Sequence, residues 1–182
     1  MAGGLAGPPA PRRRYHSRIH GARRAEQPPG HPSRSDLNAP FSGRCACGSI
    51  RYQCTAAPLA MINCHCGDCQ RSSGAPFASG VVVKTADLQV DGTPKAYTVR
   101  GSTGALVTRS FCAECGTPLF PRGEANTEFT SIRFPSLDDA AQFRPMLDIW
   151  TSSAQPWVCL DESIPHFPQS PAAPEPRRTD AP

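Results

Sequence analysis

The sequence predicts a mainly β domain that carries metal-binding cysteine clusters and lies between two disordered tails. Short apolar or alternating segments occur throughout the middle of the chain, whereas long helical patterns are few. Seven of the nine cysteines fall in closely spaced groups. Both ends of the chain are rich in proline and show no hydrophobic periodicity.

These features divide the 182-residue chain into three predicted parts. Residues 1–40 and 168–182 are predicted to be disordered, and residues 41–167 to form the folded domain. Residues 1–40 hold seven arginines against Glu26 and Asp36, a net charge of +5. The predicted domain holds ten basic and eleven acidic side chains, a net charge of −1. The domain therefore has no excess positive charge for nucleic acid, and such a role would depend on the arginine-rich tail alone.

The strands are expected in order along the domain. Ile50, Tyr52 and Cys54 alternate with polar residues and predict a half-buried strand. A turn is expected at Asp91-Gly92, between two short strands, and a single helical turn is expected to start at Ser136. The remaining strands are predicted from their apolar and alternating residues at 77–83, 88–90, 97–99, 106–111, 129–134 and 147–150.

The spacing of the cysteines indicates metal binding rather than disulfides. Cys45 and Cys47 form the first group, and Cys112 and Cys115 form the third. Such close spacings suit thiolates that converge on one ion, and they rarely serve as structural disulfides. We therefore expect a reducing compartment, the cytoplasm. The rival interpretation of Cys112 and Cys115, a redox dithiol, lacks the surrounding βαβ pattern.

The second group, Cys64, Cys66 and Cys69, offers three thiolates within six residues. Three protein ligands leave one position of a tetrahedral zinc open, as a catalytic zinc requires, whereas a structural zinc is closed by four. A second closed site, with His65 or a distant residue as fourth ligand, is the alternative. The neighbouring cysteines already face the ion, so the side chain of His65 is expected to point away. Spacing alone also leaves open that Cys45 and Cys47 share an ion with part of this group.

Other candidate residues carry weaker signals. Cys54 and Cys159 are expected to be packing residues. Arg71, which follows the second group, is either a solvated loop charge or a binding residue for a substrate carboxylate. The role of His166 is open. The chain shows no apolar run near the length of a membrane span and no signal-peptide core.

The cysteine groups stand among further segments in a fixed order. The segments are GRCACG (43–48), CHCGDCQRSSGAPF (64–77), RSFCAECGTPLF (109–120), SLDD (136–139), FRP (143–145), PWV (156–158) and IPHF (164–167). Together they resemble the GFA family (glutathione-dependent formaldehyde-activating enzymes), which also includes the CENP-V proteins. The stretch after Cys69 resembles the microbial branch.

The resemblance implies a small zinc-bearing fold of two β-sheets, similar to that of methionine sulfoxide reductase B. It also implies two Zn²⁺ ions per chain. Cys45, Cys47, Cys112 and Cys115 would hold a structural zinc, and Cys64, Cys66 and Cys69 a catalytic one. The implied activity is that of a carbon–sulfur lyase acting on glutathione, or a similar thiol, and formaldehyde or a related aldehyde.

Two other function classes remain as alternatives. One is a zinc-dependent thiol carrier or sensor that binds a thiol without turnover. The other is a structural two-zinc module, with the arginine-rich tail touching nucleic acid. The sequence does not determine the true substrate or the oligomeric state.

Overall fold

The computed structural model describes residues 39–101 and 103–171. Of the predicted disordered tails, 1–40 and 168–182, residues 1–38 and 172–182 lie outside the described residues. Residues 168–171 are described, and the carbonyl oxygens of Pro168 and Gln169 accept bonds from the amides of Ser152 and Trp150. Within the described part, no helix is long and apolar enough to cross a membrane. The prediction of a mainly β domain is confirmed, and α1 (Gly67–Ser73) is the one α-helix among the described residues.

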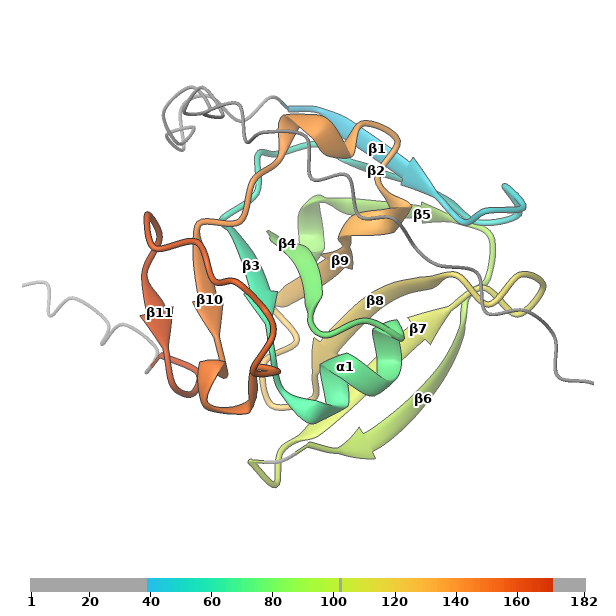
Figure 1. Cartoon of the computed structure of the whole chain (residues 1–182). Helices are drawn as coiled ribbons and strands as arrows, with labels where there is room; N and C mark the ends of the chain where they lie inside the picture. The colour runs from blue at the N-terminus through green and yellow to red at the C-terminus, as the bar shows by residue number, and fades with distance from the viewer. Residues whose placement is uncertain (1–38, 102, 172–182) are drawn as a thin grey trace, which may run out of the picture. The chain divides into compact units, whose positions relative to one another are not determined.

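Hydrogen bonding divides the strands into three sheets, one more than the resemblance implies (Figure 1). The first is antiparallel and runs in the order β1 (Phe41–Arg44), β2 (Arg51–Cys54), β5 (Leu88–Asp91). The second is mixed, in the order β11 (His166–Phe167), β10 (Leu147–Ile149), β3 (Ala60–Cys64), β4 (Ala78–Lys84), β9 (Phe129–Arg133). The third is antiparallel, in the order β6 (Lys95–Arg100), β7 (Leu106–Phe111), β8 (Pro118–Gly123).

Four short 3₁₀ turns connect these strands within the described residues: Thr85–Asp87, Phe134–Ser136, Ala140–Gln142 and Thr151–Ser153. The predicted strands at 106–111 and 129–134 coincide closely with β7 and β9. The expectations did not include β1, β3, β8 and β11, which have two to six residues each. Strands this short carry too few residues for a clear alternating pattern.

The turn at Asp91-Gly92 does not join two paired strands. β5 pairs with β2, and β6 pairs with β7, so the chain passes here from the first sheet to the third. Gly92 has a φ of +89°, and a Cβ at this position would lie 2.4 Å from the carbonyl oxygen of Ser49. Only glycine fits this backbone position without strain.

The helical turn expected at Ser136 is also corrected. The 3₁₀ turn begins later, at Ala140, and has no side-chain cap. The Ser136 hydroxyl donates to the Arg133 carbonyl oxygen at 2.8 Å and lies 2.8 Å from the hydroxyl of Tyr52. Because Ser136 is buried and its hydroxyl is engaged in these bonds, it holds the 133–136 segment against β2 and does not cap a helix.

The apolar core lies where the three sheets meet. Met61, Val81, Ile132 and Leu119 come from β3, β4, β9 and β8, and all are fully buried. Tyr52 and Phe120 pack edge to face with ring centroids 5.2 Å apart, which joins the first sheet to the third. Full burial of such side chains stabilises the fold by roughly 1.5–3 kcal/mol each.

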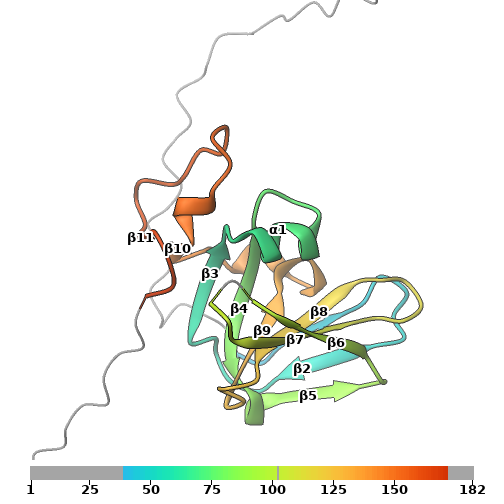
Figure 2. The ribbon, with the colours of Figure 1, turned by 90° about the horizontal axis from the view of Figure 1, so that it is seen from below.

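The chain's C-terminal strands extend the edge of the second sheet. β10 runs parallel to β3, with Ile149 opposite Cys64, and β11 runs parallel to β10 (Figures 1 and 2). The His65 amide donates to the Ile149 carbonyl oxygen at 3.0 Å. Segments more than 80 residues apart in sequence therefore support the start of α1, where the second cysteine group lies.

Candidate functional site

Two tight turns hold the first and third cysteine groups. Cys45 accepts a backbone bond from Gly48 at 3.0 Å, and Cys112 accepts one from Gly116 at 2.9 Å. Gly48 and Gly116 have φ values of +77° and +73°, a conformation that favours glycine. Each turn thus presents its two sulfurs to the same side. Thr117, whose hydroxyl accepts from the amide of Ala46 at 3.1 Å, ties the two turns together.

The four sulfurs of these turns converge. The Sγ atoms of Cys45, Cys47, Cys112 and Cys115 all lie within 4.8 Å of one another. Cys45 Sγ and Cys47 Sγ are 3.4 Å apart, and Cys47 Sγ and Cys112 Sγ are 3.6 Å apart. Four thiolates bound to one zinc at 2.3 Å in a tetrahedron lie about 3.8 Å from each other, so the arrangement fits a tetrahedral ion.

Hydroxyl groups contact the two exposed sulfurs of this four-cysteine cluster. Cys45 and Cys112 are each 1% exposed, whereas Cys47 and Cys115 reach the surface. The Ser49 hydroxyl lies 2.8 Å from Cys47 Sγ, and the Thr117 hydroxyl lies 3.1 Å from Cys115 Sγ. The bond with Thr117 lowers the pKa of Cys115 to about 5. The cluster could hold a metal ion with all four positions filled by the protein.

The second cysteine group lies at the junction of β3 and α1. Cys64 ends β3, Cys66 is the N-cap of α1, and Cys69 lies in its first turn. The Cys66 sulfur accepts a bond from the Cys69 amide at 3.4 Å, so a ligand sulfur also takes the capping role. Gly74 ends the helix in the left-handed conformation, with a φ of +68°. A helix of seven residues shows no clear periodicity, so the sequence did not predict α1.

The three sulfurs of this group form a second cluster. The Sγ atoms of Cys64, Cys66 and Cys69 lie within 4.8 Å of one another, and those of Cys64 and Cys66 are 3.5 Å apart. Bonds from Cys64 and Cys66, together with the nearby Arg133 guanidinium, lower the pKa of Cys69. This three-cysteine cluster could hold a metal ion, and three protein ligands leave one tetrahedral position for another molecule.

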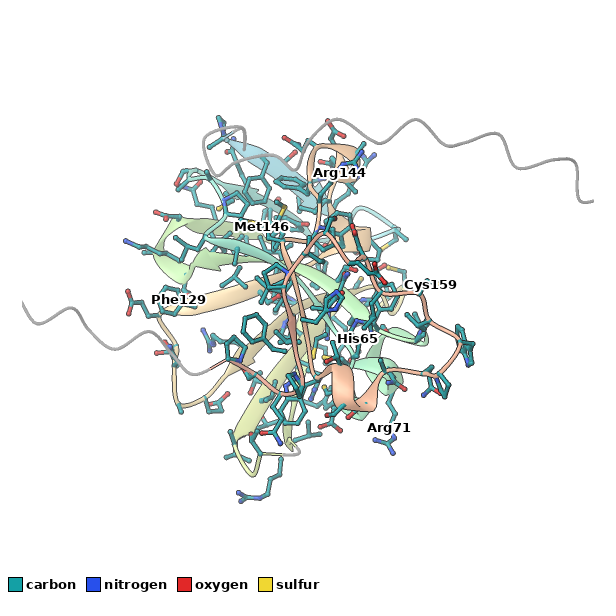
Figure 3. All side chains as sticks on the ribbon, turned by 60° about the vertical axis from the view of Figure 1, so that its left-hand side comes forward. His65, Arg71, Phe129, Arg144, Met146 and Cys159 are labelled. Carbon is teal, nitrogen blue, oxygen red and sulfur yellow. The ribbon has the colours of Figure 1, made fainter. Side chains whose placement is uncertain are left out.

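His65 is not part of the three-cysteine cluster. Its ring is 1% exposed, and Nε2 lies 3.3 Å from Oδ1 of Asp148, which is 2% exposed. The other carboxylate oxygen of Asp148 lies 3.5 Å from Nε2 of His166. Asp148 therefore joins the segment between two cysteines to the C-terminal strands β10 and β11. Figure 3 labels His65 among the side chains near the middle of the view.

A cavity of about 290 Å³ lies beside the three-cysteine cluster. All three cysteines line it, and much of its wall is apolar, from Ile62, Val107, Ile149 and other side chains. The charged groups on its wall are Asp68, Arg109 and Arg133. A second hollow, of about 240 Å³, shares Arg109 and Arg133 with the first. The cluster is thus open to a small molecule from a partly apolar, positively charged space.

Arg133 and Arg109 were not among the candidate residues from sequence reasoning. Arg133, 6% exposed, has Nη2 3.9 Å from Cys69 Sγ and 3.3 Å from Ser72 Oγ. The alternation of β9 suggested only a strand, and the proximity of Arg133 to Cys69 arises from the sheet. Arg71 instead projects outward with its side chain 83% exposed, 3.8 Å from Asp68, and it does not line the cavity with the cysteines (Figure 3).

The two remaining cysteines differ from each other. Cys54 is fully buried and its thiol donates to the Ala56 carbonyl oxygen at 3.3 Å, as expected of a packing residue. Cys159 is exposed, so the expectation that it packs is wrong. It lies in a surface segment beside Trp157, which is itself 70% exposed, and the adjacent apolar residues therefore do not enclose it. Every cysteine in the described part of the chain is a free thiol.

The chain is similar to known proteins at the level of one solved structure and one family model. A crystal structure of a Rhodobacter sphaeroides protein, a structural genomics target, is similar, with a TM-score of 0.44 and 23% identity. That similarity covers 54% of this chain and 88% of the other. The search of curated proteins found no match. The sequence model of the family described as glutathione-dependent formaldehyde-activating enzyme (GFA) matches residues 40–153, which include both cysteine clusters. Because this match spans more than half of the chain, the protein belongs to the GFA family.

Proposed function

We propose that this protein is a zinc-dependent carbon–sulfur lyase that joins a small thiol, such as glutathione, to formaldehyde or a related aldehyde. The observation that carries the proposal is the three-cysteine cluster, whose sulfurs converge at the wall of a cavity and do not fill a tetrahedral site. Membership of the GFA family supports the choice of glutathione and formaldehyde. The free thiols support a reducing location, the cytoplasm.

The proposed metal assignment follows the two clusters. Cys45, Cys47, Cys112 and Cys115 would hold a structural Zn²⁺, and Cys64, Cys66 and Cys69 a catalytic one. All-thiolate sites of tetrahedral spacing favour zinc over the harder ions Mg²⁺ and Ca²⁺. A zinc ion with an open position supplies acidity, since it lowers the pKa of a thiol that coordinates it.

The reaction is an addition in which atoms and charge balance. The sulfur of the thiol forms a bond to the carbonyl carbon, the C=O π bond breaks, and the thiol proton ends on the carbonyl oxygen. The product is a hemithioacetal, and no oxidant or reductant is needed. The reverse reaction, cleavage of the carbon–sulfur bond, returns both reactants.

The protein's own side chains have separable tasks in this reaction. The Arg133 guanidinium, close to Cys69 and without a carboxylate partner among the described residues, would offset the negative charge of three thiolates. Asp68 is the one carboxylate on the cavity wall and would exchange the proton. The apolar wall would exclude water from the reacting atoms.

The test is metal content followed by turnover. Protein purified without chelator should contain two zinc ions, and a variant with Cys64, Cys66 and Cys69 all changed to Ser should contain one. We expect this variant to keep its fold by circular dichroism and to lose turnover of glutathione with formaldehyde. Cys54→Ala is the matched control, because Cys54 is outside both clusters. One zinc in the parent protein, or collapse of the triple variant, would contradict the proposal.

The second candidate is a thiol carrier or sensor. It is favoured by one observation: His65, the histidine nearest to the cysteines, is buried against Asp148 and does not line the cavity. A general base other than Asp68 is therefore missing from the described cavity wall. Thiol binding that is unaffected by aldehyde and gives no product would support the carrier, whereas an aldehyde-dependent rate that falls in Asp68→Asn would support the lyase.

A further inference from the structure

We propose that Arg109 forms an anion subsite that makes the protein select thiols carrying a carboxylate. The proposal rests on the thiol binding that the proposed function assigns to the three-cysteine cluster, and it adds the residue that discriminates between thiols. Arg109 lies near the middle of β7, where its Cα is paired with Tyr97 on one side and Pro121 on the other.

The position of Arg109 directs it to the cavity. Val107 and Arg109 are two residues apart on one strand and so lie on the same face of the sheet. Both line the cavity that holds Cys64, Cys66 and Cys69. Arg109 also lines the second hollow, so its side chain stands where the two spaces approach each other.

The charge of Arg109 has no counter-ion in the described structure. Its Nε atom is buried and makes no hydrogen bond, and no carboxylate of the described residues forms an ion pair with it. A buried polar atom without a partner is costly, and the rest of this half-buried guanidinium has no anion beside it among the described residues. A ligand that places an anion beside Arg109 would accept a hydrogen bond from Nε and would balance the charge of the guanidinium. A carboxylate suits this role, because its two oxygens match the geometry of a guanidinium.

The other arginines near the cluster are already engaged. Arg133 donates to Ser72 and lies close to the Cys69 sulfur, so its charge faces the thiolates. Arg71 lines the second hollow but not the cavity with the cysteines, and it is exposed near Asp68, where water would weaken any attraction to a ligand. Arg109 is therefore the guanidinium on the cavity wall that is left for the ligand.

The chemical class follows from this geometry. The thiol would face the three-cysteine cluster, and a carboxylate on the same molecule would face Arg109. A thiol lacking the carboxylate would leave the Nε atom unpaired. Discrimination of this kind is strong, because it depends on a buried polar group that only the correct ligand satisfies.

The experiment compares two small thiols on the full-length protein. 3-Mercaptopropionate carries a carboxylate, and 2-mercaptoethanol does not. Both are titrated into protein loaded with Co²⁺, and binding is followed by the change in visible absorption and by calorimetry. We expect the wild type to bind 3-mercaptopropionate at least about tenfold more tightly, the size of a hydrogen bond to a charged group. Arg109→Gln should remove this preference, and Arg109→Lys should restore part of it.

The matched control is Arg144→Gln, which should leave the preference unchanged because Arg144 is exposed and lines neither this cavity nor the second hollow. Equal affinity of the wild type for the two thiols would overturn the proposal, whether or not Arg109→Gln folds. Loss of affinity for both thiols to the same extent in Arg109→Gln would also overturn it. Turnover with aldehyde is measured separately. Thiol selectivity without turnover refutes the proposed function alone, and turnover without selectivity refutes the subsite alone.

Discussion

The two cysteine clusters use the same ligand atom for opposite purposes. The four-cysteine cluster joins two turns that are more than 60 residues apart in sequence, and it fills a tetrahedron by itself. The three-cysteine cluster comes from six consecutive residues and leaves one position facing a cavity. The first brings together the sheets that contain β2 and β7, whereas the second rests on elements that are already joined by strand pairing.

This difference teaches that the number and origin of the ligands decide what a site contributes. Ligands from distant segments hold the chain together, so their metal binding is also folding free energy. Ligands from one short segment restrict the chain much less, because few residues lie between them. We therefore expect the four-cysteine cluster to contribute mainly to stability and the three-cysteine cluster mainly to reactivity.

The largest expected effect on the free energy of unfolding is at the four-cysteine cluster. Cys112→Ser removes a ligand that is 1% exposed and breaks the link between the two turns. Metal binding at such sites is worth roughly 10–16 kcal/mol in small zinc domains, so we expect a loss of several kcal/mol in the free energy of unfolding. Chemical denaturation followed by circular dichroism measures it.

Cys159→Ser is the control for Cys112→Ser, because Cys159 is exposed and belongs to neither cluster. It should leave the denaturation midpoint unchanged. If Cys112→Ser were as stable as the triple serine variant of Cys64, Cys66 and Cys69, the proposed division between a closed and an open cluster would be wrong.

A moderate effect on the free energy of unfolding is expected at Asp148, which contacts His65 between two ligands of the three-cysteine cluster. Asp148→Ala leaves the buried Nε2 atom of His65 without its partner. The expected loss is about 1–3 kcal/mol in the free energy of unfolding. Because His65 lies between Cys64 and Cys66, the zinc proposed for the three-cysteine cluster should also be removed at a lower chelator concentration than in the wild type.

The chelator titration distinguishes support of the cluster from general destabilisation. Asp139→Ala, at an exposed carboxylate, is the matched control and should change neither quantity. Should Asp148→Ala release both of the proposed zinc ions together, Asp148 would act on the whole fold and not on the three-cysteine cluster alone.

The smallest effect on the free energy of unfolding is expected at Tyr52, in β2. Burial raises the pKa of its hydroxyl above 10, the value of a free tyrosine, and outweighs the hydrogen bond with Ser136, which acts in the opposite direction. The stability that Tyr52 contributes is therefore complete below pH 10 and is lost as the pH rises above it. Tyr52→Phe should cost about 1 kcal/mol near neutral pH, the value of one hydrogen bond.

Denaturation midpoints of wild type and Tyr52→Phe at pH 8 and above pH 10 measure this dependence. The wild type should lose its advantage over the variant at the higher pH. A difference that stays constant over this range would show that the ionisation of Tyr52 is not linked to folding.

Much of the fold class and of the ligand groups was accessible from local sequence. The alternation of Ile50, Tyr52 and Cys54 predicted a strand at β2, because side chains on a strand alternate between faces. The spacing of Cys112 and Cys115 predicted a metal-binding turn, because two intervening residues let both sulfurs face one point. These signals depend on neighbours in the chain, and so a single sequence contains them.

What the sequence determined by itself was therefore a mainly β domain with seven cysteines in three groups. The spacing of the cysteines left the partner of Cys45 open, and the family resemblance supplied Cys112, in agreement with the structure. Only the tertiary structure buried Asp148 against His65 and placed Arg109 and Arg133 at the cavity while Arg71 remained in solvent. Each of these facts joins residues from different strands or turns. Sheet pairing and chain crossings decide such contacts, and no local spacing specifies them.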